Sequence, residues 1–530
     1  MRVKNISFQD TGSFSKLLCD YLAENEDIKF LYDQFPNEKG FKKQLFYKQS
    51  QFSEHSRTVL GSSFKAQYKN VVMSKETQDA LNSLLNTNTF TVVTGHQLNL
   101  FTGPLYFLYK IVSTINLAKE LKKKFPTKNF VPVYWMATED HDFEEVNHLF
   151  VNQNKISWDT DFNGPLGNQS TAGLALVFEK FSNEIGTSSN ARYLKELFQK
   201  AYLEHTNLKD ATRYLVNELF GNQGLLILDG NDKRLKEQFI PYFKNELLNQ
   251  VAFKTVSDTN LFLAKNYKVQ AHTREINLFY IKGKLRERIL YKNKKYLINN
   301  TSISFSQTAI LKELENHPEY FSPNVITRPL YQEVLLPNLC YVGGGGELAY
   351  WLQLKAFFKK SAIPFPILLV RNSVLLISKK QGLKLDQLGI SSKELFMKQE
   401  ALITKKVKEL STLSIDLTEQ KEVLQQLFKD LLPLVKQTDR SFEGALKAQE
   451  KKQLKGLEYL EKRLLKAEKK KQKDLIIQAQ TIQDHLFPRK GLQERNANFT
   501  DFYLEYGEAF IPALLRELKP LQLKFLILDI

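Results

Sequence analysis

The chain has 530 residues, of which 42% are hydrophobic and 25% charged, so its composition is that of a folded protein and excludes general disorder. This length exceeds what a single hydrophobic core normally serves, which predicts two or three structural units. The two cysteines, Cys19 and Cys340, are too few for a disulfide framework and lack zinc or redox spacing.

The formal net charge is +17, from 75 Lys and Arg against 58 Asp and Glu, and such an excess raises the question of nucleic-acid binding. Eleven basic and five acidic residues lie between 447 and 474, a stretch with a single aromatic residue, Tyr459. A single-strand binder would use more aromatic side chains, on which bases stack. We therefore interpret this stretch as a solvated helix face and expect no nucleic-acid partner.

No apolar run approaches the roughly 20 residues of a membrane span, and the N-terminus lacks the apolar region of a secretion signal. The scarcity of cysteine fits a reducing compartment. We therefore expect a cytoplasmic protein without membrane association.

Four short apolar runs predict buried parallel strands, at residues 90–95, 130–136, 224–230 and 364–370. The first is followed by an apolar-periodic segment with Pro104 in its first turn and a lysine cluster at its end, which predicts a helix. Strands that alternate with helices indicate an α/β fold with a parallel sheet. Ligands bind at the carboxyl ends of the strands in such folds, so the site is expected in those loops.

Between residues 271 and 299 apolar and polar residues alternate, and turn-forming residues separate the runs. This pattern predicts antiparallel hairpins inserted on the main sheet. From about Lys384 the chain becomes helical and charged. A heptad a/d register, broken only by Gln420, is expected there for Leu410, Leu413, Leu417, Leu424, Leu427, Leu431 and Leu434.

Pro433 interrupts this register and predicts a helix end or kink. A second apolar stripe comprises Leu457, Leu460, Leu464 and Ala467 and closes near Pro488. Two stripes separated by a break predict an antiparallel helical hairpin, which we expect to pair with a second subunit. The apolar tail is expected to dock on the core. We thus predict a core of residues 1–383 with insertions at about 150–220 and 250–330, a helical arm of 384–490 and a returning segment of 491–530.

The loop after the first strand contains Thr94-Gly95-His96-Gln97 and Thr102-Gly103-Pro104. Its glycines allow close backbone approach, and the following helix N-terminus favours an anion. His96 is placed to donate to a phosphate or carboxylate oxygen. The alternative is that these residues only form a turn and a helix cap.

The loop after the second strand is Thr138-Glu139-Asp140-His141-Asp142. Three clustered carboxylates require a cationic ligand group, a metal, or arginine and lysine partners. An ammonium group suits the loop. A metal is the alternative, because His141, Glu145 and His148 would share one helix face. Helix capping by Asp140 or Asp142 explains one carboxylate but not three.

Four consecutive glycines, Gly343 to Gly346, precede a predicted helix and favour a backbone that wraps a ligand. The pattern matches neither a dinucleotide fingerprint nor a phosphate-binding P-loop. Arg371 directly follows the last predicted strand, and Arg328 is a second candidate for an anion. Either arginine could equally be a structural ion-pair partner of the acidic loop.

The set TGHQLNLFTGPLY, WMATEDHDFEEVNH, YVGGGGELAYW, RNS, KAQEKK and LQER resembles the bacillithiol-biosynthesis cysteine-adding enzymes, the BshC family. The resemblance runs through most of the chain. It implies a Rossmann-like core with inserted connecting segments and an α-helical coiled coil that supports a homodimer. The activity it implies is addition of cysteine to glucosaminyl-malate through an amide bond, the last step of bacillithiol synthesis.

Joining a carboxylate to an amine requires activation, and ATP is the expected source. The core also resembles class I aminoacyl-tRNA synthetases in Thr94-Gly95-His96-Gln97, whereas Ser378-Lys379-Lys380 does not match their lysine-rich loop. The residues predicted to bind nucleotide are Thr94, Gly95, Asn99, Thr102, Gly103, Gly343, Gly344, Gly345, Asn372 and Ser373. A metal requirement is left open.

In the resulting hypothesis, Glu139, Asp140 and Asp142 hold the ammonium group of cysteine. His96, Gln97 and the helix N-terminus at 102–104 stabilise negative charge on the activated carboxyl or phosphate. His141 is the candidate base for the sugar amine. The further substrate-binding candidates are Arg371, Arg328, Tyr341 and Glu347. The alternatives are a non-catalytic nucleotide-binding dimer and an RNA-binding protein derived from a synthetase.

Overall fold

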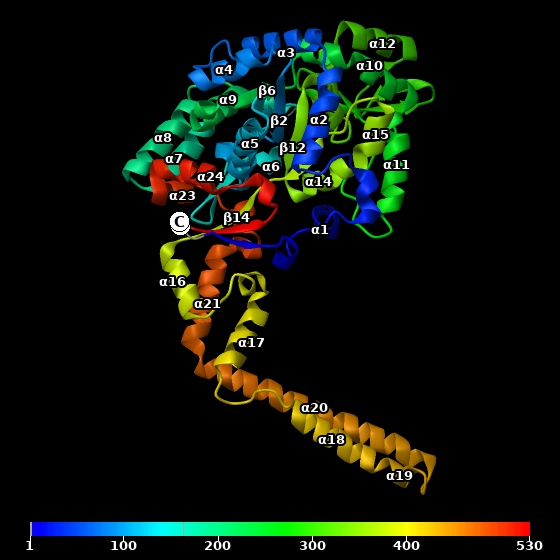
Figure 1. Cartoon of the computed structure of the whole chain (residues 1–530), viewed down its shortest axis with the longest axis vertical. Coiled ribbons are helices and arrows are strands. Elements are labelled where there is room, and N and C mark those ends of the chain that lie inside the picture. The colour runs from blue at the N-terminus through cyan, green and yellow to red at the C-terminus, as the bar shows by residue number, and fades with distance from the viewer. Residues whose placement is uncertain (1–2, 163) are drawn as a thin grey trace.

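A five-stranded parallel sheet lies at the centre of the computed structural model, which describes residues 3–162 and 164–530 (Figure 1). Its strand order is β13-β12-β2-β3-β6, and every neighbouring pair is parallel. The five strands are β2 (Thr89–His96), β3 (Asn129–Met136), β6 (Leu226–Asp229), β12 (Asn338–Gly343) and β13 (Ile367–Val370). This sheet confirms the predicted Rossmann-like α/β fold and all four predicted strands. The fifth strand, β12, was not predicted, because its apolar run is short and glycines follow it.

Helices pack against this sheet and explain why its strands are apolar on both faces. α5 (Tyr106–Lys124) packs against β2 and β3 and buries most of its own residues, as predicted, although it begins two residues after Pro104. α2 packs against β12 and β13, and α3 and α4 pack against β6. The remaining helices near this sheet are α1 (Lys16–Leu22), α2 (Glu38–Gln51), α3 (Glu54–Gln67), α4 (Lys75–Ser83), α14 (Gly345–Trp351) and α15 (Lys355–Lys360).

Two insertions interrupt the central sheet. The first contains α6 (Phe143–Val146), the hairpin of β4 (His148–Val151) and β5 (Asn154–Ser157), and the helices α7 (Leu174–Ile185), α8 (Ser189–Tyr202) and α9 (Leu208–Phe220). The second builds an antiparallel sheet of order β10-β9-β8-β7-β11, which confirms the predicted hairpins.

The strands of this second sheet are β7 (Leu278–Lys282), β8 (Leu285–Lys292), β9 (Lys295–Ile298), β10 (Ser304–Phe305) and β11 (Phe321–Pro323). Its accompanying helices are α10 (Lys233–Asn249), α11 (Val251–Leu263), α12 (Gln307–Asn316) and α13 (Arg328–Leu335).

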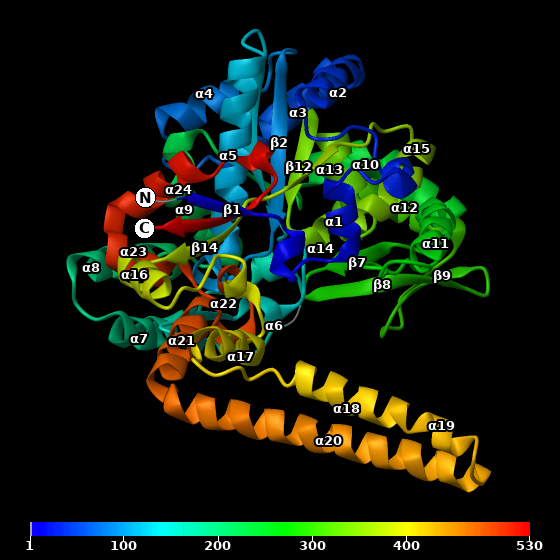
Figure 2. The same ribbon diagram turned by 60° about the horizontal axis from the view of Figure 1, so that its bottom comes forward.

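A helical arm projects from the body of the molecule (Figures 1 and 2). It consists of α16 (Lys379–Gln387), α17 (Gln399–Leu410), α18 (Thr418–Asp430), α19 (Leu432–Val435), α20 (Arg440–Lys471) and α21 (Lys473–Leu486). α18 lies along α20 in the predicted antiparallel hairpin, where Lys421 and Glu461 form an ion pair of 2.5 Å. The predicted break at Pro433 is confirmed, since α18 ends at Asp430 and α19 starts anew.

The predicted heptad register is wrong between Leu410 and Leu417. Residues 411–417 form no helix, so Leu413 and Leu417 lie outside α17 and α18. The physical reason is local hydrogen bonding. Asp416 accepts hydrogen bonds from the backbone N–H and the hydroxyl of Thr418, which stabilises a turn ahead of α18.

The C-terminal residues return to the body, as predicted. α22 (Gln493–Asn496), α23 (Phe499–Tyr506) and α24 (Phe510–Glu517) lead to β15 (Phe525–Asp529). β15 pairs antiparallel with β1 (Val3–Ile6) and parallel with β14 (Ser373–Ile377), so the two ends of the chain meet in one sheet (Figure 2). Among the described residues, no helix combines the length and apolarity needed to cross a membrane.

Candidate active site

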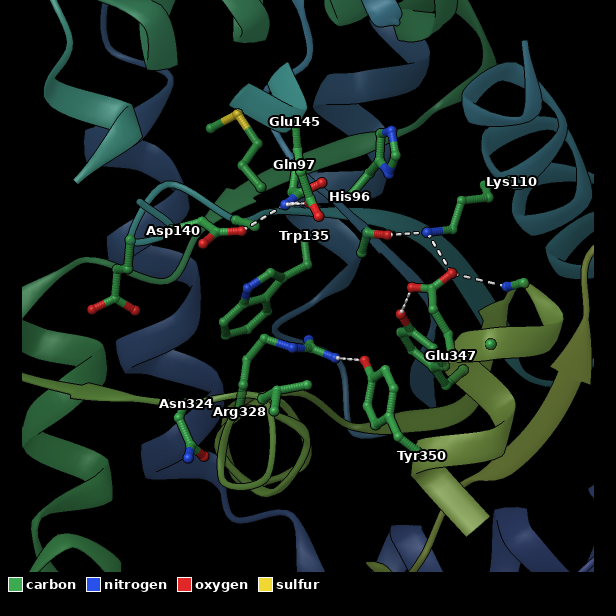
Figure 3. Close-up of a pocket in the computed structure, with 18 of the residues that line it drawn as sticks. His96, Gln97, Lys110, Trp135, Asp140, Glu145, Asn324, Arg328, Glu347 and Tyr350 are labelled. Atoms are coloured by element: carbon green, nitrogen blue, oxygen red, sulfur yellow. Dashed lines mark hydrogen bonds and ion pairs between the residues drawn. The ribbon is translucent and has the colours of Figure 1, made fainter. Parts of the chain in front are cut away.

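A cavity of about 640 Å³ opens at the carboxyl ends of β2, β3 and β12, where the sequence predicted a site (Figure 3). The loops after these strands form part of its wall. The second insertion and the C-terminal segment form the rest. The charged and hydrogen-bonding side chains in the wall include Gln97, Lys110, Glu139, Asp140, Glu145, Gln270, Arg286, Asn324, Arg328, Tyr341, Glu347, Tyr350, Arg371 and Arg495.

One side of the cavity carries two carboxylates that share a single hydrogen-bond donor. Gln97 Nε2 lies 2.8 Å from Asp140 Oδ2 and 2.7 Å from Glu145 Oε2 (Figure 3). Neither carboxylate has a lysine or arginine ion-pair partner within 3–162 and 164–530. Two acidic groups on one neutral amide leave a negative region that suits a cationic ligand group.

Asp140 is ionised despite its environment. Burial opposes its ionisation, but hydrogen bonds from His141 and from the Gln97 amide outweigh burial and hold its pKa well below the usual range. The carboxylate therefore keeps its negative charge at neutral pH.

The other residues of the acidic loop are placed differently. Glu139 lies in the wall, but Lys236, which is fully buried, forms an ion pair of 2.6 Å with it. Asp142 is exposed and does not line the cavity. The half-exposed ring of His141 also lies outside the lining, with Nδ1 2.6 Å from Arg286 Nη1.

The metal alternative for this loop relied on a helix that does not form. α6 covers only Phe143–Val146, and His148 begins β4, so the predicted common face of His141, Glu145 and His148 is wrong. The chain leaves the helix early because His148 pairs with Ser157 in the β4–β5 hairpin. No group of three His, Cys, Asp or Glu side chains within the described part of the chain could hold a metal ion.

The loop after β2 binds mainly to the protein itself. Thr94 donates to the carbonyl of Val342 at 2.7 Å, and Asn99 donates to the carbonyl of Glu145 at 2.9 Å. The Asn498 side chain donates to the carbonyl of Gly103 at 2.6 Å. Thr94, Asn99, Thr102 and Gly103 lie outside the cavity lining, whereas Gly95, His96 and Gln97 lie within it.

His96 packs beside the rings of Tyr106 and Phe107, at centroid distances of 5.4 and 5.0 Å. Burial, together with Lys110 and Arg371, lowers the pKa of His96 well below its ordinary value, so the ring is neutral at pH 7. Its Nε2 is buried and makes no hydrogen bond to any residue that the structure describes.

The glycine-rich turn after β12 binds a carboxylate of the protein itself, that of Glu347. Gly344 N–H and Lys110 Nζ lie 2.8 and 2.7 Å from Glu347 Oε2, and Tyr341 donates to Glu347 Oε1 at 2.6 Å (Figure 3). Gly344, Gly345 and Gly346 line the cavity, and Gly343 does not. A Cβ at Gly343 would lie 2.8 Å from the Tyr341 ring, so close packing explains this glycine.

The two predicted arginines differ in their partners. Arg371 is buried and forms a two-fold contact with Glu494, at 2.9 and 2.8 Å. Arg328 donates to Tyr350 Oη at 3.2 Å (Figure 3). It also donates to Gln332 Oε1 at 3.1 Å, and no carboxylate of the described chain forms an ion pair with it. Arg328 is therefore available to a ligand anion.

The neighbours of Arg371 are committed to structural contacts. Asn372 donates from its side chain to the carbonyl of Lys519, and Ser373 accepts from Arg371. Both lie outside the cavity lining.

Several cavity residues were not predicted from the sequence. Lys110, a lone cation among apolar residues of α5, carried a usable signal, because a buried lysine needs a partner. Arg286, Asn324 and Arg495 come from the second insertion and the C-terminal segment. No local pattern marks them, because only the tertiary fold brings them to the cavity.

Comparison with known proteins identifies similar chains over the whole length. Residues 1–372 match a family model described as "Bacillithiol biosynthesis BshC, N-terminal Rossmann-like domain". Residues 374–530 match one described as "Bacillithiol biosynthesis BshC, C-terminal coiled-coil domain".

Curated relatives carry the description "Putative cysteine ligase BshC". One from Flavobacterium johnsoniae is 55% identical and covers 99% of both chains. One from Flavobacterium psychrophilum is 53% identical and covers 99% of this chain and 98% of its own. One from Cytophaga hutchinsonii is 36% identical and covers 98% of this chain and 97% of its own.

A solved structure titled as a "putative arginyl t-RNA synthetase" from Campylobacter jejuni aligns with 83% of this chain and 97% of its own. Its sequence identity is 11% and its TM-score 0.22, which is too low to support an argument about fold or activity.

Proposed function

The chain belongs to the BshC family of bacillithiol biosynthesis, and from this we propose that it is a cytoplasmic ligase that adds L-cysteine to glucosaminyl-malate. The carboxyl group of cysteine would form an amide with the sugar amine, the last step of bacillithiol synthesis. The observation that carries the proposal is the pair of carboxylates, Asp140 and Glu145, held by one side-chain amide in the cavity.

This carboxylate pair suits the ammonium group of cysteine. Among the residues described, neither Asp140 nor Glu145 forms an ion pair with a lysine or arginine, and Gln97 fixes both in place. The nearest basic group to Asp140 is the ring of His141, with Nδ1 3.6 Å from Asp140 Oδ1, and Arg286 acts on Asp140 from farther away. A bound ammonium would add positive charge beside the two carboxylates and would donate to both of them. We therefore assign the ammonium site to Asp140 and Glu145. Glu139, which Lys236 neutralises, would position the loop.

Arg328 suits the malate part of the acceptor. Its guanidinium lies in the cavity wall, and its hydrogen bonds to the described residues go to two neutral groups, Tyr350 and Gln332. A guanidinium binds carboxylates through paired hydrogen bonds. In the view of Figure 3, the ring of Trp135 lies between Arg328 and the carboxylate of Asp140.

Formation of an amide from a free carboxylate is uphill in water, so we propose that ATP activates the cysteine carboxyl. When bound, ATP would supply the phosphoryl or adenylyl group that activates this carboxyl, with ADP or pyrophosphate as the leaving group. Of the residues predicted to bind nucleotide, Gly95, Gly344 and Gly345 lie in the cavity wall. A Cβ at neighbouring Gly346 would meet only the Gln270 amide, at 4.0 Å, so backbone is open to a ligand here. These residues fit close approach of phosphate groups.

The role of His141 as base stays a proposal. Its exposed ring lies at the edge of the site beside Arg286. Proton removal from the sugar amine would require the acceptor to reach that edge.

The test is an assay of the full-length protein with cysteine and glucosaminyl-malate, with and without ATP, read by mass spectrometry. We expect the amide-linked thiol product only when ATP is present. ATP binding without product formation would instead support a non-catalytic nucleotide-binding dimer. RNA retention that falls steeply with salt, again without product, would support the RNA-binding alternative.

A further inference from the structure

The C-terminal segment places a charged side chain in the wall of the cavity. Arg495 lies in α22, within the part of the chain that matches the coiled-coil domain model. The strands that carry the acidic loop and the glycine-rich turn belong to the other domain. The cavity is therefore built from both domains.

The residues before Arg495 are held firmly. Gln493 accepts from Leu376 N–H at 2.9 Å and donates to the Leu376 carbonyl at 3.0 Å, as a neighbouring strand would. Glu494 is completely buried, accepts from both terminal nitrogens of Arg371, and accepts from Val374 N–H at 3.1 Å. These contacts fix α22 against β14.

The residues after Arg495 are attached to the loop that follows β2. The carbonyl of Ala497 accepts from Leu105 N–H at 2.8 Å. The Asn498 side chain donates to the carbonyls of Phe101 and Gly103, at 2.9 and 2.6 Å. The backbone on both sides of Arg495 is thus bound to the domain that carries the rest of the cavity.

Arg495 itself makes no such contact. Arg495 is exposed and lines the cavity, and its guanidinium has neither an ion pair nor a hydrogen bond with the residues at 3–162 and 164–530. Lys110 and Arg371, by contrast, are neutralised by Glu347 and Glu494. A free guanidinium on an anchored backbone is preorganised for a ligand oxyanion.

We propose that Arg495 binds an oxyanion of the substrates, so that the C-terminal domain completes the active site. The two sources of this chemistry are the malate carboxylates of the acceptor and the phosphates of ATP, and both identities rest on the proposed function. Arg495 is a substrate-binding residue in either case.

The experiment compares the full-length protein with the variants R495Q and R495K. The matched control is R463Q, which removes an exposed arginine of α20 whose recorded contacts are with Tyr459 of the same helix. Each protein is titrated calorimetrically with L-malate alone and with ATP alone. The KM values for glucosaminyl-malate, ATP and cysteine are measured in the ligase assay, and thermal unfolding reports on the fold.

R495Q is expected to weaken binding of one anion roughly ten- to a hundredfold, the effect of losing a hydrogen bond to a charged group. The cysteine KM should stay unchanged, R495K should restore part of the affinity, and R463Q should equal the wild type. Loss confined to malate assigns the carboxylate source, and loss confined to ATP assigns the phosphate source.

Unchanged affinity for both anions in R495Q would overturn the proposal. So would an equal rise in all three KM values together with a lower unfolding temperature, because that pattern indicates a structural role. Absence of malate and ATP binding by the wild type would overturn it as well. If the wild type binds an anion but forms no product, the proposed ligase activity fails while the titrations still decide the role of Arg495.

Discussion

Asp140 and Asp142 stand two residues apart in the acidic loop but have different surroundings. Asp140 lines the cavity and accepts from Gln97, whereas Asp142 is exposed and lies outside it. We predict that D140N raises the KM for cysteine roughly tenfold or more, because a charged hydrogen-bond acceptor is lost. D142N is the matched control and should keep the wild-type value. Steady-state kinetics at varied cysteine concentration tests this, and equal KM values in both variants would contradict the assignment.

Asp501 gives a pH-dependent prediction. Burial, with a contribution from Glu184, raises the pKa of Asp501 to about 6, although the Asn152 N–H donates to it. The folded state therefore binds an extra proton between about pH 4 and 6, so the free energy of unfolding decreases as pH rises through this window. The ionised carboxylate destabilises the fold fully above about pH 6.

D501N removes this penalty, because an amide does not ionise and can still accept from Asn152. We predict that the variant is more stable than the wild type above pH 6, by up to about 3 kcal/mol, and that the difference vanishes near pH 4. Thermal unfolding from pH 4 to 8 measures it. D258N, at an exposed position on α11, should show no such trend. A D501N difference that is constant with pH would refute the role of ionisation.

Individual site residues were predictable where chemistry is local in the sequence. Gln97, Asp140 and Glu347 line the cavity because they follow strands or lie beside the glycine-rich turn, and Arg328 lines it from the first turn of α13. Glu139 was expected to have a free carboxylate. Its ion pair with Lys236 could not be predicted, since Lys236 lies on a helix almost a hundred residues later. The same distance in sequence concealed Arg286 and Arg495.

Among the elements, β13, β14 and α22 are joined by a buried ion pair between Arg371 and Glu494. We predict that E494Q lowers the free energy of unfolding by about 3–5 kcal/mol, because it leaves a buried guanidinium without a counter-charge. The double variant R371M/E494L should lose much less, since both charges are removed together. Urea unfolding provides the measurement.

The matched control for this ion pair is the exposed contact between Lys447 and Glu443 on α20. E443Q should change stability by less than about 1 kcal/mol, because surface ion pairs contribute little. Equal losses in E494Q and E443Q would show that burial of the first pair has no energetic consequence.

Helices and strands with strong periodicity were predicted well. The strands β2, β3, β6 and β13, the helix α5 and the β7–β9 hairpins follow from apolar patterns and turn residues. The arm was predicted as a hairpin, but its leucine spacing suggested a continuous register across 411–417. The hydrogen bonds that Asp416 accepts from Thr418 stabilise a turn there instead of a helix. The periodicity of apolar residues alone does not predict such a turn.

At the scale of the whole molecule, the arm leaves apolar side chains exposed. Val423, Leu427 and Leu460 on α18 and α20 are 70%, 53% and 56% exposed. We propose that they pair with a second copy of the chain, as expected from the sequence. Light scattering should then give twice the 61.5 kDa of one chain, and L427E/L460E should yield monomers. L176E, at a 67% exposed leucine of α7, should remain dimeric. A wild-type protein with the mass of one chain in light scattering would contradict this proposal.

The position of β15 has a consequence for synthesis of the protein. Val3 pairs with Leu528, and β15 also completes the edge of β14. While the ribosome translates the chain, β1 and β14 both emerge before β15, the strand with which each of them pairs. β1 therefore carries an open edge through nearly all of translation, and β14 carries one from Ile377 until β15 is made at Phe525. An open strand edge is the condition in which nascent chains associate with one another. A premature stop codon or a proteolytic cut before Phe525 would leave the same two edges open in the released protein, and quality-control proteases could recognise them.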